Sequence, residues 1–167
     1  QVVSIARNVL FLPAILISLL IFFACASDES TAIPAPESIS VTDALGKTLL
    51  FESTPTTIAA ISPTAIEILY AAGGSSILRD RASNFPKEVR ELPDVGSAYD
   101  PSIEALVAAQ PDLVIVEAVT QSRFVSKLEG SGLKVMAVRA ESAEDVMNNI
   151  EMVGKVIGKI SVAAKKI

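Results

Sequence analysis

The chain has 167 residues, half of them hydrophobic, with a formal net charge of −5 and no histidine. The lack of histidine excludes Ser-His-Asp and Cys-His nucleophile pairs and the usual zinc ligands, and the acidic balance argues against nucleic-acid binding. The single cysteine, Cys25, excludes an intrachain disulfide and a thiolate metal cluster, and we expect neither a bound metal nor a cofactor.

The first element is an uncharged apolar run over residues 9–24, with Arg7 just upstream. The run is shorter than the ~20 residues that span a bilayer, and small residues follow it. We therefore interpret residues 1–24 as a signal segment. A transmembrane anchor is the alternative, and either one places the remainder outside the cytoplasm. Residues 25–38 are rich in Ser, Pro, Ala and acids, which predicts a disordered tether.

Residues 39–51 predict a small β-hairpin, in which Gly46 supplies the positive φ of a tight turn. After Pro55, short apolar runs alternate with helical periodicity, which indicates an α/β fold with a parallel sheet flanked by helices. The predicted strands are residues 57–61, 76–79, 113–118 and 134–138. The predicted helices start at Ser62-Pro63, at Asp100-Pro101 and near residue 121, and a short helix lies within residues 83–93.

The last segment, residues 142–167, carries apolar residues every three or four positions after Ser142 and Asp145, a start that resembles a capping box. This pattern predicts one helix of about 25 residues, about 37 Å long, which exceeds an ordinary crossover. Gly154 and Gly158 have the G-x-x-x-G spacing, which we interpret as close packing against a sheet.

Candidate ligand contacts gather where the predicted strands end, the edge at which open parallel sheets bind ligands. No phosphate-binding glycine motif occurs there. Arg81 and Arg139 could bind an anionic group, and Tyr99 stands at a strand exit; ordinary ion pairing and turn packing are the alternatives. Glu67 and Glu104 lie in first helical turns, where dipole stabilisation accounts for them without catalysis.

Five blocks carry a family resemblance: VTDALGKTLLF, TTIAAISPTAIEILYAAG, FPKEVRELPDVG, DPSIEALVAAQPDLVIVE and LEGSGLKVMAV. In this order they resemble the first lobe of the helical-backbone periplasmic binding proteins, which deliver iron-siderophores, cobalamin or haem to ABC importers. The resemblance implies a Rossmann-like N-terminal ligand-binding lobe over residues 39–141. Residues 142–167 would then be the long interlobe helix, with a second lobe beyond this chain.

The resemblance also assigns roles to residues. Glu104 would dock onto arginines of the membrane permease, and Glu67 would be structural. Cys25 would carry a lipid anchor, with ordinary cleavage at Ala24-Cys25-Ala26 as the alternative. The ligand-facing loops, together with Arg81, give this set of expected contacts: Ser62, Pro63, Arg81, Ser83, Asn84, Phe85, Ser97, Ala98, Tyr99 and Glu117.

We therefore expect an exported, non-catalytic binding component that captures an iron chelate and hands it to a membrane permease. A ferric siderophore is the first choice of cargo, with haem and cobalamin as alternatives in the same family. Ala82 stands where cobalamin-binding relatives can carry an aromatic, which disfavours cobalamin, and the missing histidines disfavour zinc and manganese. An extracytoplasmic Rossmann-like enzyme and a sensory lipoprotein are rivals from other classes.

Overall fold

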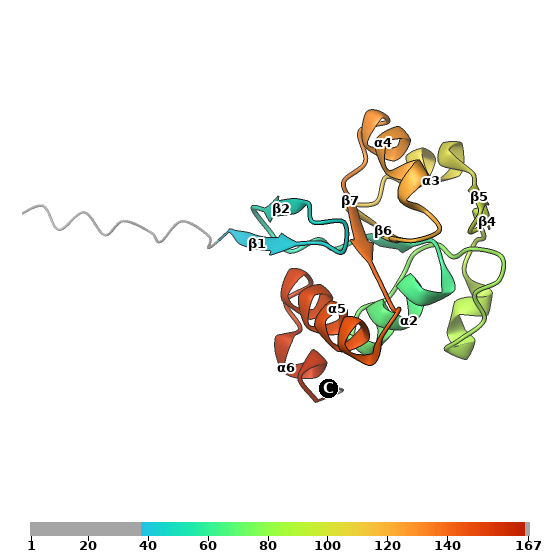
Figure 1. Cartoon of the computed structure of the whole chain (residues 1–167). Helices are drawn as coiled ribbons and strands as arrows, with labels where there is room; N and C mark the ends of the chain where they lie inside the picture. The colour runs from blue at the N-terminus through green and yellow to red at the C-terminus, as the bar shows by residue number, and fades with distance from the viewer. Residues whose placement is uncertain (1–37, 166–167) are drawn as a thin grey trace, which may run out of the picture. The chain divides into compact units, whose positions relative to one another are not determined.

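The structure is a computed structural model that describes residues 38–165 (Figure 1). The predicted signal segment, Cys25 and the tether up to residue 37 lie outside these residues. Within the described part of the chain, no helix is both long and apolar enough to cross a membrane.

The centre of the fold is a parallel sheet of three strands, β3 (Ile58–Ala60), β6 (Leu113–Glu117) and β7 (Val135–Val138). The strand order is β3-β6-β7, so the strand in the middle of the sequence also lies in the middle of the sheet. Every residue of the three strands is buried. Near-continuous apolar runs of this kind are expected when helices cover both faces of a sheet, and the predicted α/β class is confirmed.

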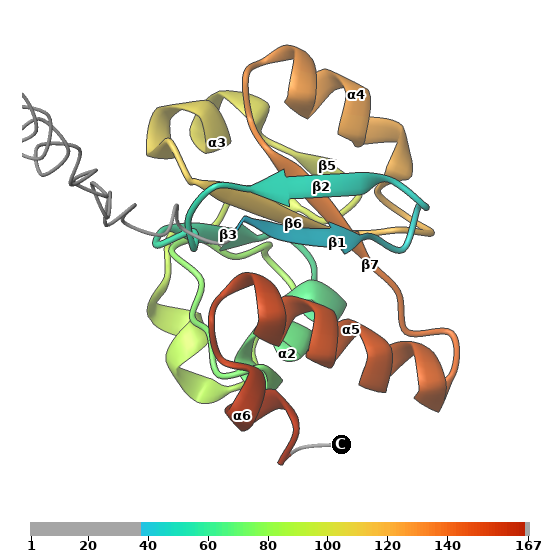
Figure 2. The same cartoon turned by 90° about the vertical axis from the view of Figure 1, so that its left-hand side faces the viewer.

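Helices cover the two faces of this sheet in pairs, as Figures 1 and 2 show. On one face, α2 (Pro63–Ala71) and α5 (Ala143–Val156) form a core with alternate strand residues, among them Ile115. On the other face, α3 (Ile103–Ala109) and α4 (Ser122–Gly130) pack on the remaining strand residues. The period-two alternation of the strands thus divides one sheet between two hydrophobic cores.

The predicted hairpin is confirmed as β1 (Ile39–Thr42) paired antiparallel with β2 (Thr48–Phe51). Gly46 has φ of 78° in its turn, as the sequence predicted. A buried carboxylate, that of Asp43, accepts hydrogen bonds from the Leu45 and Lys47 N–H groups and from the Ala137 N–H at 3.0 Å. This side chain therefore ties the hairpin turn to β7.

The strand predicted over residues 76–79 is wrong. The segment runs beside β3, where the Ile77 N–H donates to the Ile58 carbonyl at 2.8 Å, but its only ladder contact is an isolated bridge between Arg79 and Asp94. The buried Ser76 hydroxyl accepts the Ala60 N–H at 2.9 Å, in place of a backbone carbonyl. The Ser76 side chain therefore takes the hydrogen bond that a neighbouring strand would otherwise accept from β3, and no regular ladder forms. The predicted short helix is present as η1 (Lys87–Glu91).

The expected helix start at Asp100-Pro101 is also wrong. These two residues form β5 (Asp100–Pro101), which pairs with β4 (Gly96–Ser97). The helix α3 is capped instead by Ser102, whose hydroxyl accepts the Ala105 N–H at 3.1 Å. Serine is a strong N-cap residue, and its extended backbone here places the hydroxyl for that bond.

The single long helix predicted for residues 142–167 is interrupted. Its capping box at Ser142 and Asp145 is confirmed, but α5 ends at Val156, and a short α6 (Ile160–Ala163) folds back on it. Gly158 has φ of 68°, and the Lys159 N–H donates to the Gly154 carbonyl at 2.7 Å, which is a Schellman stop. The predicted packing of Gly154 against a sheet is wrong: Gly154 packs against α6, because an added Cβ would lie 2.5 Å from the Ala163 Cβ.

Candidate ligand-binding edge

The loops predicted to bind ligand lie at the carboxyl edge of the sheet. Since β3, β6 and β7 are parallel, the residues that follow Ala60, Glu117 and Val138 leave the sheet on the same side. The loop before η1 joins this edge through the Arg81 N–H, which donates to the Gly96 carbonyl at 2.7 Å. The structure therefore brings together the strand exits that the sequence singled out.

Gln121, which the sequence analysis did not single out, connects three of these loops. Its side chain is fully buried. The amide nitrogen Nε2 donates to the Ile61 carbonyl at 2.8 Å and to the Ala98 carbonyl at 2.9 Å. The amide oxygen Oε1 accepts the Glu117 N–H at 2.9 Å. The sequence placed Gln121 at a helix start, but nothing in its spacing shows that the side chain turns back toward the sheet.

The Glu117 carboxylate is engaged by the loop that follows β6. It accepts the Val119 N–H at 2.9 Å, the Thr120 N–H at 2.7 Å and the Thr120 hydroxyl at 2.8 Å. Burial alone would raise the pKa of Glu117, but these hydrogen bonds and the positive charge of Arg139 lower the pKa below its ordinary value. Glu117 is therefore ionised at neutral pH and shapes this loop.

Three serines of the predicted set also bond within their own loops. The Ser62 hydroxyl caps α2 by accepting the Ala65 N–H at 3.1 Å, with Pro63 in the first turn, as the sequence predicted. The Ser83 hydroxyl donates to the buried Asp80 carboxylate. The Ser97 hydroxyl accepts the Tyr99 N–H at 3.2 Å. Each hydroxyl thus fixes the backbone conformation of its loop.

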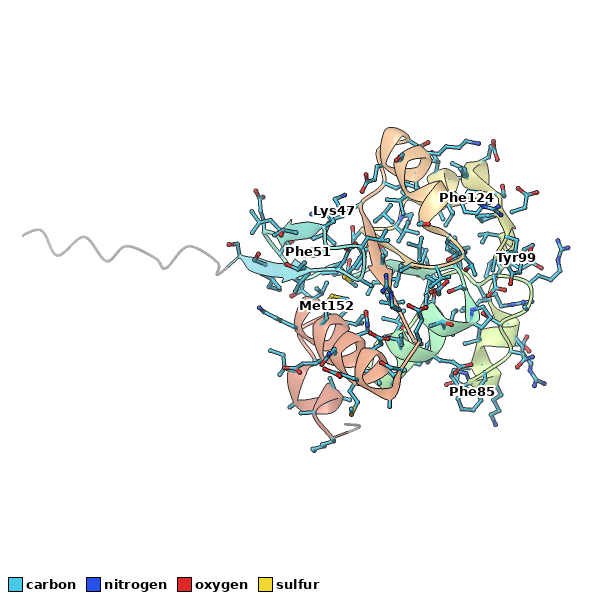
Figure 3. The ribbon with its side chains drawn as sticks, viewed as in Figure 1. Lys47, Phe51, Phe85, Tyr99, Phe124 and Met152 are labelled. Atoms are coloured by element: carbon cyan, nitrogen blue, oxygen red, sulfur yellow. The ribbon has the colours of Figure 1, made fainter. Side chains whose placement is uncertain are left out.

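Four other members of the predicted set present their side chains to solvent: Arg81, Asn84, Phe85 and Tyr99. Phe85 is 66% exposed and Tyr99 is 65% exposed, which is unusual for large aromatic residues. Figure 3 shows both on the side of the molecule away from the hairpin residues Lys47 and Phe51. The Arg81 Nε lies 3.9 Å from an Asp94 carboxylate oxygen, and its side chain is 73% exposed. These four side chains are free to contact a ligand.

A shallow depression of about 320 Å³ adjoins this edge between α2 and α5. Phe85 is the one predicted contact among its lining residues, which also include Glu67, Ala140 and Ile150. Depressions of about 350 and 460 Å³ near the hairpin hold none of the predicted contacts. Within the described residues, no group of three or more His, Cys, Asp or Glu side chains could hold a metal ion.

The predicted docking residue, Glu104, lies in the first turn of α3, after the turn that carries Tyr99. It is exposed, and its Oε2 lies 3.4 Å from the Ser102 hydroxyl. Glu67 is exposed on α2 and lines the shallow depression.

A parallel sheet lies between two helical layers, with hydrogen-bonded loops and exposed aromatic side chains at its carboxyl edge, the edge at which open α/β sheets bind ligands. The architecture matches the fold that the sequence resemblance implied. The chain belongs to the periplasmic binding protein family, whose model matches residues 58–167.

Known relatives include vitamin B12-binding proteins. The chain is 34% identical over 101 residues to the vitamin B12-binding protein of Vibrio parahaemolyticus serotype O3:K6, an alignment that covers 59% of this chain and 37% of that protein. The crystal structure of the periplasmic vitamin B12 binding protein of Vibrio cholerae matches with a TM-score of 0.62 and 26% identity, over 68% of this chain and 46% of that one.

A second solved structure, the periplasmic catecholate-siderophore binding protein of Vibrio cholerae, matches with a TM-score of 0.66 over 77% of this chain and 48% of that one. Its identity of 18% supports the shared fold alone. In all three comparisons the chain spans less than half the length of the relative.

Proposed function

We propose that this protein is the extracytoplasmic substrate-binding component of an ABC importer and that its cargo is a corrinoid of the cobalamin type. The observation that carries the cargo assignment is the 34% identity to a vitamin B12-binding protein over 101 residues. A second vitamin B12-binding protein, from Salmonella choleraesuis, is 31% identical over 91 residues. The assignment replaces the ferric siderophore as the first choice of cargo.

The geometry of the edge supports binding without catalysis. The Glu117 carboxylate and the hydroxyls of Ser62, Ser83 and Ser97 are hydrogen bonded within their loops. A preorganised edge of this kind costs little entropy when a ligand binds. The exposed rings of Phe85 and Tyr99 offer apolar faces to a large planar cargo, and Arg81 offers a cation to its acidic or carbonyl groups.

A ferric siderophore is the second candidate, and one residue favours it. Ala82 is exposed on the ligand-facing loop, where the sequence resemblance indicates that cobalamin-binding relatives can carry an aromatic side chain. Without that ring, the loop offers less apolar area to a corrin. The two cargoes therefore differ in which exposed side chains should contribute most: the rings of Phe85 and Tyr99 for a corrinoid, and Arg81 for an anionic iron chelate.

Calorimetric titration of the protein in its natural length tests the proposal. We expect saturable binding of cyanocobalamin with one site per molecule, weakened by Tyr99→Ala. Tyr70 is only partly exposed on α2 and packs on a core, so Tyr70→Phe is the matched control that keeps affinity. Binding of a ferric catecholate in preference to cyanocobalamin would transfer the assignment to iron. If cyanocobalamin, haem and ferric chelates all fail to bind, the assignment of an iron or cofactor cargo is wrong.

The proposed partner in the membrane is an ABC permease, contacted through Glu104. Its carboxylate is exposed and lies at the start of α3, outside the ligand-binding loops. It can therefore form charge-assisted hydrogen bonds with arginines of a partner without disturbing the cargo.

Attachment to the membrane through a lipid on Cys25 is part of the same proposal. Cys25 lies outside the described residues and directly follows the apolar run. Mass spectrometry of the mature N-terminus is the test, with a lipid-modified Cys25 as the expected result. An unmodified start at Ser27 would rule out the anchor.

A further inference from the structure

The hydrogen-bond ladder between β3 and β6 ends in an unusual way. The Leu113 N–H donates to the Thr57 carbonyl at 3.2 Å, and the Ile61 N–H donates to the Ile115 carbonyl at 3.1 Å. In a parallel ladder, alternate residues of a strand point their N–H groups at the same neighbour. The next rung would therefore join the Glu117 N–H to the Ile61 carbonyl.

The carboxamide of Gln121 stands where that rung would be. The Glu117 N–H donates to Gln121 Oε1 at 2.9 Å, and Gln121 Nε2 donates to the Ile61 carbonyl at 2.8 Å. One direct bond between two strands has become two bonds through a side chain. The ends of β3 and β6 are therefore held apart by the width of an amide, at the edge where the ligand-facing loops begin.

The second amide proton of Gln121 reaches outward, to the Ala98 carbonyl at 2.9 Å. The orientation of the amide is fixed by its partners, because a flipped amide would set its oxygen against two carbonyls and its nitrogen against an N–H. The neighbouring Tyr99 carbonyl accepts a bond from Arg123 Nη2 at 2.6 Å. Two consecutive carbonyls of the turn that carries Tyr99 therefore accept hydrogen bonds from the start of α4. Gln121, the N-cap residue, bonds the Ala98 carbonyl, and Arg123 bonds the Tyr99 carbonyl.

We propose that Gln121 is a positioning residue for cargo recognition, which holds the sheet edge open and fixes the Ala98-Tyr99 turn beside the gap. This inference rests on the proposed binding function. Tyr99 is largely exposed, so few packing contacts fix its ring, and its position follows from its backbone. Affinity that depends on preorganised loops is lost when such an anchor is removed, even where the loop residues themselves are unchanged.

Replacing the amide by an apolar group of similar size distinguishes this role from ordinary core packing. In Gln121→Leu, the Glu117 N–H and the Ile61 carbonyl can pair directly and complete the ladder. The Ala98 carbonyl has no replacement donor among the contacts seen here. The edge should then close while the turn loosens, with a loss of about tenfold or more in cargo affinity, the effect of about one good hydrogen bond.

Gln121→Glu provides a second variant with a pH signature. Its ionised carboxylate would face the Ile61 and Ala98 carbonyls, whereas the protonated acid regains one donor. A buried carboxyl that faces carbonyls favours its protonated form. The cargo affinity of Gln121→Glu, relative to that of the natural protein, should therefore recover as the pH falls from about 7 to about 5. Gln121→Leu, which has no titratable group at this position, should show no such recovery.

The experiment measures cyanocobalamin affinity and amide hydrogen exchange on the same variants of the full chain. We expect faster exchange over residues 96–102 in Gln121→Leu and Gln121→Asn, with unchanged exchange over α5. Gln110→Asn is the matched control, because Gln110 is exposed at the end of α3 and its positive φ of 46° suits asparagine. This control should keep both affinity and exchange.

Two results separate this inference from the proposed function. Exchange over residues 96–102 that stays at the natural rate in both variants would overturn the positioning role. If the natural protein binds no cargo, the proposed function fails, and the exchange data still decide whether Gln121 fixes the turn. Should Gln121→Leu fail to fold, Gln121→Asn decides through its exchange over the same segment.

Discussion

Replacing Glu117 by alanine tests whether this buried acid shapes the binding edge or contacts the cargo. The side chain is 8% exposed, and its carboxylate accepts three hydrogen bonds from Val119 and Thr120 at 2.7 to 2.9 Å. Hydrogen bonds to a charged group contribute about 1.5–3 kcal/mol each. Desolvation of the carboxylate offsets several kcal/mol of the total contribution of the three hydrogen bonds. We expect Glu117→Ala to lower the free energy of unfolding by about 2–4 kcal/mol at neutral pH.

The pH dependence of this loss has a defined sign. The folded structure lowers the pKa of Glu117, so its stabilising contribution is fully present above the pKa of an unfolded glutamate, about 4.3. The contribution declines as the pH falls through the lowered pKa of the folded state. The difference in unfolding free energy between the natural protein and Glu117→Ala should therefore be largest near neutral pH and should narrow in acid.

Urea unfolding followed by far-ultraviolet circular dichroism, at about pH 7 and about pH 3, measures both effects. Glu151→Ala is the control, because Glu151 is exposed on α5 and should change the unfolding free energy by less than about 0.5 kcal/mol. Cargo affinity of Glu117→Ala should fall together with stability. A variant that keeps its stability but loses cargo affinity would refute this reasoning and make Glu117 a direct ligand contact.

Three further predictions concern other parts of the lobe. Glu104→Lys should abolish uptake in a transport assay while calorimetry shows unchanged cargo affinity; a large loss of affinity would contradict the docking role. Hydrogen bonds from Thr56 and Thr57 hold the pKa of Asp112 well below its usual range. Asp112→Ala should therefore cost about 1 kcal/mol in urea unfolding at pH 7 and progressively less below about pH 4; a pH-independent cost would contradict this. Gly154→Ala should destabilise by about 1–2 kcal/mol through its clash with Ala163, and adding Ala163→Gly should recover that loss; additive effects in thermal unfolding would exclude the contact.

Much of the fold could be predicted because its signals are local. The buried strands appear as continuous apolar runs, since helices cover both faces of the sheet. The caps at Ser62 and Ser142 could be predicted because a hydroxyl followed by a helical pattern satisfies free N–H groups within three residues. The hairpin followed from Gly46, since its turn requires a positive φ.

Two errors have different local causes, a side chain that replaced a backbone partner and a glycine that ended a helix. Ser76 resembled a strand residue, yet its hydroxyl takes the N–H of Ala60 and prevents a regular ladder. The apolar period continues past Gly158, which the sequence analysis interpreted as a packing residue, but Gly158 is the left-handed stop of α5. Periodicity reports which face of an element is buried, and it does not report whether the backbone continues in the same direction.

The candidate site also combines features that the sequence predicts with features that depend on the assembled fold. The strand exits could be located from the sequence, because parallel strands place their carboxyl ends on one edge. The role of each side chain at that edge could not be predicted. Gln121, for example, bonds Ile61 and Ala98, which lie 60 and 23 positions away in the chain. Contacts of that separation depend on the assembled sheet and leave no periodic signal.

The edge contains side chains that are hydrogen bonded within the loops and side chains that are exposed, and the two groups should affect cargo selectivity differently. The polar groups of Glu117, Ser62 and Ser83 are hydrogen bonded within their loops. Substitutions at these positions that alter cargo selectivity would therefore also destabilise the edge. Selectivity can change at lower cost at exposed side chains such as Arg81 and Tyr99, which support nothing else in the described residues beyond one long ion pair. A shared fold at 18% identity is then compatible with different cargoes, since the supporting groups can be retained while the exposed ones vary. Exchanging the exposed set, with the supporting set left in place, should therefore change which cargo binds without unfolding the lobe.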